Sequence, residues 1–306
     1  MSNPPWSVIL AAGKGRRLTS VTGGLPKQFW APRGDRTLLE QTVERMSVLS
    51  PLKRIVTVVD RSQREYAEAI SARTPVGRLA YQEGDRGTAA GVLRGLVEVP
   101  SDPDALVIVT PADHGVARPE VFHRGIREAA KQILGGHTGI VLLAVRPDSP
   151  TGDLGWIMSN SDARPAGGLP LVSRFVEKPH PSLARDLFAA GAVWNTMVMV
   201  SRVGALLELY RAHLPALADI FSQARAIPSD LREAFLADYY PDLPHTDFSR
   251  DVLTPARGLS LYVWPASLGW TDLGTPDRLD IWLRGRSARQ SMPVIGLAPY
   301  PLATAG

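Results

Sequence analysis

Short runs of apolar and β-branched residues alternate with segments of helical spacing along the first half of the chain. The runs predict strands over residues 7–10, 54–59, 105–110 and 139–144, and the segments between them predict helices over 38–49, 63–72, 89–97 and 119–134. Because the predicted strands are apolar on both faces and separated by helices, they indicate a mostly parallel sheet that is covered on both sides. Loops at the carboxyl ends of such strands meet at one edge, where ligands bind in open α/β sheets.

The pattern changes after about residue 150, where glycine- and proline-rich connections become frequent. Strands are predicted over 171–176, 192–200 and 259–264, and helices over 181–190, 203–213 and 230–239. We interpret residues 1–285 as one α/β domain whose second half, from about 151, extends the same sheet and supplies a different ligand pocket. Residues 286–306 have weak periodicity and several prolines, and we predict that they form a tail.

Composition indicates a soluble globular protein and removes several kinds of site. The 306 residues are 44% hydrophobic and 21% charged, and the net charge of +4 is spread without a basic cluster, which argues against a nucleic-acid partner. There is no cysteine, which excludes disulfides, thiolate nucleophiles and cysteine-based metal sites. No run approaches the roughly 18 apolar residues of a membrane helix. The N-terminus also lacks a signal-like segment, so we expect a cytoplasmic protein with no membrane partner.

The loop after the first predicted strand carries glycines and cations in close succession. Residues 13–17 read Gly-Lys-Gly-Arg-Arg, so backbone N–H groups could approach phosphate oxygens while the cations add positive charge. Taken alone, this loop fits a structural turn as well as a phosphate cradle. It is not a dinucleotide fingerprint, because Leu18 stands where the third glycine would be, and it is not a Walker A loop, which needs Gly-Lys followed by Ser or Thr.

A second segment, Pro-Lys-Gln-Phe at 26–29, has to be considered together with this loop. Residues 10–18, Leu-Ala-Ala-Gly-Lys-Gly-Arg-Arg-Leu, together with this segment resemble the signature of sugar-1-phosphate nucleotidyltransferases, and the Pro-Lys-Gln-Phe form is most similar to mannose-1-phosphate guanylyltransferases. Further segments that resemble the family's motifs follow in its order at 83–90, 110–114, 151–157, 175–179, 194–196 and 269–274. The resemblance implies a Rossmann-like three-layer α/β/α fold with a mostly parallel mixed sheet.

The resemblance also implies where substrates bind, with a nucleotide half over about 1–150 and a sugar-phosphate half over about 151–285. Lys27, Arg17 and Asp113 are expected to be catalytic, with Lys27 on the α-phosphate and Arg17 on the leaving phosphates. Asp113 and Asp272 would hold Mg²⁺, which prefers carboxylate and phosphate oxygens. Lys27 and Arg17 are also expected nucleotide contacts, and the others are Leu10, Ala11, Ala12, Gly13, Gly15, Arg86, Gly87, Thr88 and Ala89. The expected sugar-phosphate contacts are Gly152, Gly155, Glu177, Lys178 and Asn195.

The implied reaction joins a sugar-1-phosphate to a nucleoside triphosphate and gives a nucleotide sugar and pyrophosphate, with GTP and mannose-1-phosphate favoured. A phosphomonoester has a second pKa of about 6, so the attacking phosphate is mostly ionised near pH 7 and needs no protein nucleophile or general base. Holding two anions in line can supply about 7–11 kcal/mol, and charge stabilisation adds to this. We therefore expect His114 to pack or hydrogen-bond behind Asp113 rather than to move a proton.

Some positions depart from the family's pattern and leave alternatives open. Positions 11 and 12 are alanines where guanylyl members usually have glycines, and Met197 stands where a glycine is usual. Asp-Phe-Ser at 247–249 matches only in part. The chain could therefore transfer another nucleotide, use another sugar, or be a nucleotide-sugar-binding regulatory protein without activity. Retention of the expected metal carboxylates and lysines argues against the last alternative, and the sequence leaves homo-oligomerisation open.

Overall fold

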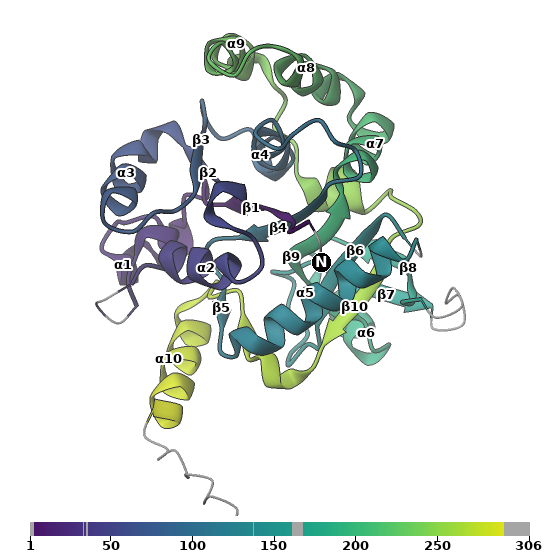
Figure 1. The fold of residues 1–306 in the computed structure, drawn as a ribbon. Coiled ribbons are helices and arrows are strands. Elements are labelled where there is room, and N and C mark those ends of the chain that lie inside the picture. The colour runs from purple at the N-terminus through teal and green to yellow at the C-terminus, as the bar shows by residue number, and fades with distance from the viewer. Residues whose placement is uncertain (1–2, 33, 35, 137, 161–167, 291–306) are drawn as a thin grey trace, which may run out of the picture.

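The computed structural model describes residues 3–290 except 33, 35, 137 and 161–167, and in them a nine-stranded sheet lies between two layers of helices (Figure 1). The strand order is β3-β2-β1-β4-β9-β6-β10-β8-β7. These strands are β1 (Trp6–Leu10), β2 (Ile55–Asp60), β3 (Arg78–Gln82), β4 (Leu106–Pro111), β6 (Ile140–Val145), β7 (Trp156–Asn160), β8 (Leu171–Val176), β9 (Val193–Arg202) and β10 (Ser260–Trp264). A separate pair joins β5 (Gly115–Val116) to β11 (Trp270–Thr271).

Strand directions confirm a mostly parallel mixed sheet. β1 pairs in parallel with β2 and β4, β2 pairs in parallel with β3, and β6 pairs in parallel with β10. β9 runs antiparallel between β4 and β6, and β8 runs antiparallel between β10 and β7. β8 and β9 therefore oppose the common direction of the other strands in this sheet. β7 also pairs with β9, through Trp156 opposite Trp194, so the second half of the sheet curls back onto itself.

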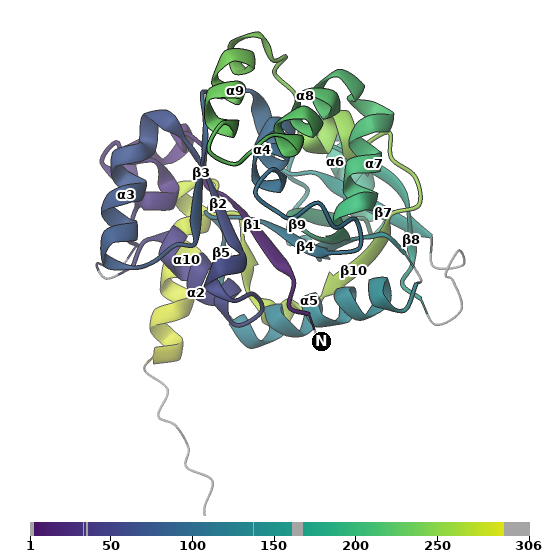
Figure 2. The same cartoon turned by 45° about the horizontal axis from the view of Figure 1, so that its top comes forward.

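Helices cover both faces of the sheet, as the sequence predicts (Figures 1 and 2). One buried cluster joins the sheet to α4, α7 and α8, and a second joins the opposite face to α2, α3, α5 and α6. The helices are α1 (Thr19–Thr22), α2 (Leu38–Ser47), α3 (Arg64–Arg73), α4 (Gly87–Leu96), α5 (Pro119–Leu134), α6 (Pro181–Ala189), α7 (Val203–His213), α8 (Pro215–Ala226), α9 (Arg232–Tyr239) and α10 (Pro276–Gln290).

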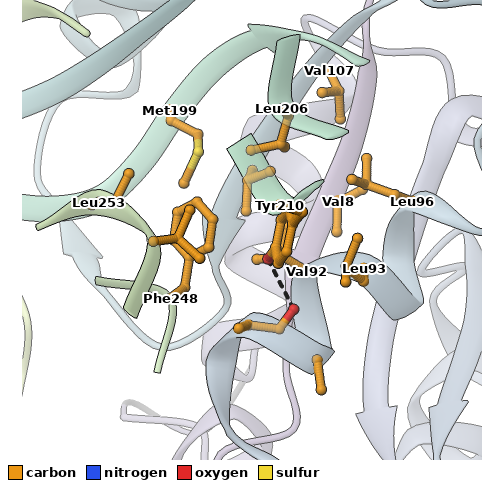
Figure 3. Close-up of a cluster of buried hydrophobic side chains, with 14 of the residues drawn as sticks. Val8, Val92, Leu93, Leu96, Val107, Met199, Leu206, Tyr210, Phe248 and Leu253 are labelled. Carbon is orange, nitrogen blue, oxygen red and sulfur yellow. Dashed lines mark hydrogen bonds between the residues drawn. The ribbon is translucent and has the colours of Figure 1, made fainter. Parts of the chain in front are cut away.

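Alternate residues of the central strands enter the two clusters. In β4, Val107 and Val109 belong to the cluster under α4, whereas Ile108 belongs to the cluster on the α5 side. Successive side chains of a strand point to opposite faces, so an all-apolar strand has to be buried on both sides. Figure 3 shows the α4 side, where Tyr210 packs on Phe248 with ring centroids 5.6 Å apart and donates a hydrogen bond to the Ala89 carbonyl at 2.9 Å.

α10, at the end of the described chain, packs against the loop that follows β1. Leu279 and Trp282 of α10 pack with Leu18, Leu38 and Leu273 in a third buried cluster. The helix continues to Gln290, so the predicted domain boundary at 285 falls inside it, and residues 291–306 of the predicted tail lie outside the described residues. None of the helices in the described part of the chain is long and apolar enough to cross a membrane.

Candidate active site

The loop after β1 is held by the side chain of Gln28. Gln28 is buried, and its amide nitrogen lies 2.8 Å from both the Ala11 and the Gly13 carbonyl oxygens. These bonds fix the loop through its carbonyl groups and leave Ala12 and Gly13 on the wall of a cavity. Gln28 was not among the predicted site residues, although the Pro-Lys-Gln-Phe segment contains it.

Gly15 is the point where this loop touches the lysine segment. Its φ is +61°, and a Cβ at this position would lie 2.8 Å from the Lys27 backbone nitrogen. Glycine is needed both for the left-handed conformation and for the close approach. The structure thus packs the predicted phosphate loop directly on the short helix η2 (Lys27–Phe29), which begins with the predicted catalytic lysine.

Lys27 contacts both residues that were predicted to bind the metal, Asp113 through its carboxylate and Asp272 through its backbone. Its side chain is 8% exposed, and its ammonium lies 3.0 Å from the Asp113 carboxylate. It also donates a hydrogen bond to the backbone carbonyl of Asp272. Three residues separated by up to 245 positions therefore meet at one ammonium group, although Asp272 joins it through its backbone carbonyl and not through its carboxylate.

Both carboxylates are held ionised by neighbouring cations. Burial raises the pKa of Asp113, but the Lys27 ammonium outweighs it, so the pKa lies below its usual value. Burial likewise raises the pKa of Asp272, but a hydrogen bond from Arg278 outweighs it and the pKa is again lowered. The Arg278 guanidinium lies 2.7 Å from the Asp272 carboxylate, and it also stacks over the Trp194 ring at 5.0 Å. Arg278 was not predicted as a site residue.

His114 packs beside Asp113, as expected. Its Nε2 lies 3.8 Å from the Asp113 carboxylate, and its ring meets Trp270 edge-on with centroids 5.2 Å apart. Burial lowers the pKa of His114 to about 4, so the imidazole is neutral near pH 7. A neutral ring with little basicity is suited to packing and a weak hydrogen bond rather than to accepting a proton.

A cavity of about 330 Å³ opens beside Lys27 and Asp113. Of the predicted nucleotide contacts, those that line it are Leu10, Ala12, Gly13, Gly87 and Thr88. Other lining residues, which the sequence did not predict as contacts, include Gln82, Asp85, His245 and Asp247. The cavity is large enough for part of a nucleotide.

The remaining predicted nucleotide contacts lie outside the cavity wall. Ala11 and Ala89 are buried in the core, and the Arg86 guanidinium donates to the Pro241 carbonyl. Arg17 is 60% exposed, and its ion pair with Asp153 is long, at 4.0 Å, so its guanidinium is accessible to an anion from solvent.

Gly87 joins the cavity to the chain segment around residue 246. Its φ is +83°, and a Cβ there would lie 2.1 Å from the Thr246 carbonyl oxygen. The Ala89 N–H donates to the same carbonyl at 3.1 Å, and the Phe248 N–H donates to the Thr88 hydroxyl at 2.8 Å. The first and second halves of the chain thus share one wall of the cavity.

The predicted sugar residues form a second group, around Glu177. A Cβ on Gly155 would lie 2.6 Å from the Glu177 carboxylate, and one on Gly152 would lie 2.7 Å from the Pro179 carbonyl, so both glycines permit close approach. Burial raises the pKa of Glu177, although the Lys178 ammonium lies 3.2 Å from it and opposes the rise. Lys178 has a φ of +44° and a side chain that is 58% exposed, which presents its ammonium to solvent.

Asn195 is buried and completes this group. Its side-chain oxygen accepts a hydrogen bond from the Met197 N–H at 3.2 Å, and its own N–H donates to the Gly155 carbonyl at 2.8 Å. Lys178, Met197 and Leu273 are the non-glycine residues with positive φ in the described chain, and each lies in or beside a predicted motif. Such strained backbone conformations persist where the surrounding structure holds them, often at functional sites.

Asp113 and Asp272 do not form a complete metal site by themselves. Within the described residues, no group of three or more His, Asp or Glu side chains could hold a metal on its own. Mg²⁺ typically uses one or two carboxylates together with phosphate oxygens and water. Asp113, with 34% of its side chain exposed, faces the cavity, while Asp272 is nearly buried beside a second cavity of about 230 Å³.

Comparison with known proteins identifies the family of the chain. The family model for nucleotidyl transferase matches residues 6–282. The alginate biosynthesis protein AlgA of Pseudomonas syringae pv. tomato is 29% identical over 276 residues, which cover 87% of this chain and 56% of AlgA. A mannose-1-phosphate guanylyltransferase of Escherichia coli K12 is 28% identical over 287 residues, which cover 88% of this chain and 58% of that protein. The chain thus spans somewhat more than half the length of these relatives.

Solved structures show the same architecture. A crystal structure described as a mannose-1-phosphate geranyltransferase from Thermus thermophilus superposes with a TM-score of 0.75 at 28% identity, covering 89% of this chain and 77% of that one. An inositol-1-phosphate CTP transferase from T. maritima, at 16% identity and a TM-score of 0.59, shares the fold. With the motifs, the converging site residues and the family match over nearly the whole described chain, this protein belongs to the nucleotidyl transferase family.

Proposed function

We propose that this protein transfers a nucleotidyl group from a nucleoside triphosphate to a sugar-1-phosphate and releases pyrophosphate. GTP and mannose-1-phosphate are the favoured substrates, because relatives that align over most of the chain include a mannose-1-phosphate guanylyltransferase. The observation that carries the proposal is the position of the Lys27 ammonium. It lies between the Asp113 carboxylate and the Asp272 backbone, beside the cavity of about 330 Å³.

The residues divide the work between two anionic substrates. Lys27 would stabilise charge at the α-phosphate, and exposed Arg17 would bind the leaving phosphates. Lys178 would hold the phosphate of the sugar, while Glu177 and Asn195 would accept or donate hydrogen bonds to its hydroxyl groups. Because the attacking phosphate is already ionised near pH 7, alignment and charge stabilisation supply the rate.

Asp113 and Asp272 are the residues that would hold Mg²⁺. When bound, the ion would neutralise phosphate charge and help to orient the α-phosphorus. Lys27 and Arg278 keep the two carboxylates deprotonated, which leaves them as oxygen ligands at neutral pH.

Pyrophosphate release from a panel of four nucleoside triphosphates and several sugar-1-phosphates tests the proposal. Turnover is expected to be fastest with GTP and mannose-1-phosphate, and to stop on addition of EDTA and return with excess Mg²⁺. Binding of nucleotide sugars without turnover for any pair would instead establish the regulatory alternative. Fast turnover with another substrate pair would support the proposed class of reaction and contradict GTP and mannose-1-phosphate as its substrates.

A further inference from the structure

Met197 has a left-handed backbone conformation at the point where β9 reaches the cavity of about 330 Å³. Its φ is +56°, in the region that favours glycine. The pairing of β9 with β6 shifts at this point, because Val198 faces Leu143 whereas Asn195 faces Ala144. Thr196 and Met197 are therefore extra residues on β9, which is the arrangement of a β-bulge. Bulges often re-aim a side chain near a site.

Neighbouring polar groups hold the bulge in place. The Asn195 side-chain oxygen accepts a hydrogen bond from the Met197 N–H at 3.2 Å. The Thr196 hydroxyl donates to the Leu143 carbonyl across the strand pair and accepts from the Val198 N–H at 3.3 Å. Both flanking side chains thus fix the backbone that presents Met197.

The Met197 side chain lies between the two groups of predicted site residues. It lines the cavity of about 330 Å³ together with Thr88, Asp113 and other residues of the nucleotide side. Its sulfur accepts a hydrogen bond from the Ser249 hydroxyl at 3.3 Å, and its backbone N–H donates to Asn195, a predicted sugar contact, at 3.2 Å. The thioether is therefore part of the partition between the nucleotide cavity and the sugar-phosphate residues.

We infer that Met197 is a specificity-determining residue that limits the size of the sugar accepted beside the nucleotide. The inference rests on the proposed function. A thioether cannot hydrogen-bond a sugar hydroxyl strongly, so it discriminates by volume. It admits hexose-1-phosphates that carry only hydroxyl groups and excludes those with an added acetamido group. A steric wall of this kind discriminates by about 10–200-fold for a group of methylene size.

The test compares glucose-1-phosphate with N-acetylglucosamine-1-phosphate, which differ only in the acetamido group. With saturating GTP, Met197→Gly and Met197→Ala are both expected to shift the ratio of kcat/KM toward the acetamido sugar by about tenfold or more. Met197→Leu, which keeps the volume, is expected to retain the wild-type ratio. An unchanged ratio in the Gly and Ala variants, or an equal shift in the Leu variant, overturns the inference.

The Ala variant separates the side chain from the backbone. Met197→Ala keeps the left-handed strain and removes the thioether, whereas Met197→Gly also relieves the strain. A shift in the Gly variant alone would assign the effect to backbone relaxation and overturn the role of the side chain. Thermal unfolding of each variant shows whether it is folded, and the Gly variant is expected to melt no lower than the Ala variant.

A binding measurement keeps this inference distinct from the proposed reaction. Absence of turnover in the wild-type protein with every substrate pair counts against the proposed function alone. The ratio of dissociation constants for the two sugar phosphates, measured by calorimetry in the presence of GTP and EDTA, gives the same readout without chemistry. An equal ratio in wild type and Met197→Ala would again overturn the inference.

Discussion

The ammonium of Lys27 lies 3.0 Å from the carboxylate of Asp113, although the two residues come from different loops at the edge of the sheet. Lys27 is almost completely buried, whereas Asp113 keeps about a third of its side chain exposed toward the cavity. The pair thus joins a buried cation to an accessible anion, and a substrate phosphate that approaches Asp113 also approaches Lys27.

Removal of Lys27 is expected to abolish most of the activity. Lys27→Ala removes the charge proposed to stabilise the α-phosphate, and we expect kcat for pyrophosphate release to fall by about 10²–10³-fold or more. Asp113→Asn keeps the shape of the side chain and is expected to lose a similar factor. Lys53→Ala, at an exposed position outside the site, is the control. Near wild-type kcat in either site variant would contradict the assigned roles.

The two glycines of the phosphate loop are expected to respond differently to alanine. Gly15→Ala places a Cβ 2.8 Å from the Lys27 nitrogen at a positive φ, whereas nothing lies within 4 Å of the corresponding atom at Gly13. Gly15→Ala is therefore expected to lower the free energy of unfolding by about 1–3 kcal/mol, and Gly13→Ala by much less. Urea unfolding measures both free energies. Equal losses would show that the close contact at Gly15 does not determine the cost of the substitution.

Gln28 is expected to act through the loop that it holds. Gln28→Leu removes the side-chain donor from the Ala11 carbonyl and leaves the Gly13 carbonyl with the Gln63 amide alone, at a cost of about 1–3 kcal/mol. We expect the KM for GTP to rise by about tenfold, which corresponds to 1.4 kcal/mol of binding. Gln132→Leu, at another buried glutamine whose amide bonds Glu128 on α5, is the matched control and should leave this KM unchanged.

Glu40 is expected to stabilise the fold in a pH-dependent way. Burial raises the pKa of Glu40, but hydrogen bonds from Arg73 and Thr37 outweigh it and lower the pKa from 4.5 to about 2. Between these values the unfolded chain binds the proton more readily, so this stabilisation is complete above pH 4.5 and is lost as the pH falls toward 2.

The corresponding variant is Glu40→Gln, which is expected to lose about 3 kcal/mol of unfolding free energy at pH 7. The difference from wild type should shrink to roughly half by pH 3. Glu44→Gln is the control, because Glu44 lies one turn further along α2 and its ion pair with Arg36 is exposed. An exposed ion pair contributes about 0–1 kcal/mol. A similar loss of unfolding free energy in both variants would therefore refute the larger contribution expected of the buried Glu40 carboxylate.

Periodicity predicts the elements that have a strong apolar pattern. The predicted ranges of α5, α7 and β8 agree with the structure to the residue, because an apolar face or a flanking proline marks their ends. β3, β7 and α8 were missed. β3 is a short edge strand that begins with exposed Arg78, and α8 begins at Pro215 directly after α7, where a proline suggests an interruption although it is well tolerated in a first turn.

In the site, too, the sequence motifs predicted some residues, whereas contacts between distant loops could not be predicted. Motif order located Lys27, Asp113 and Asp272, which the fold then brings together. Contacts such as those from Arg278 to Asp272 and from Ser249 to Met197 depend on how loops from distant positions pack, and no local pattern in the sequence reports them. Met197 stood out in the sequence as a missing glycine, but only the bulge shows where its side chain lies.

The return of β7 onto β9 has a consequence for how this molecule can meet others. β8 lies between β10 and β7, and the first two residues of β7, Trp156 and Ile157, pair with β9, so this end of the nine-stranded sheet is partly closed. In the described residues β3 is the strand whose whole outer side is open, because it pairs with β2 alone. β3 therefore offers the longest open edge to strand-to-strand oligomerisation or fibre growth, which the exposed charge of Arg78 discourages.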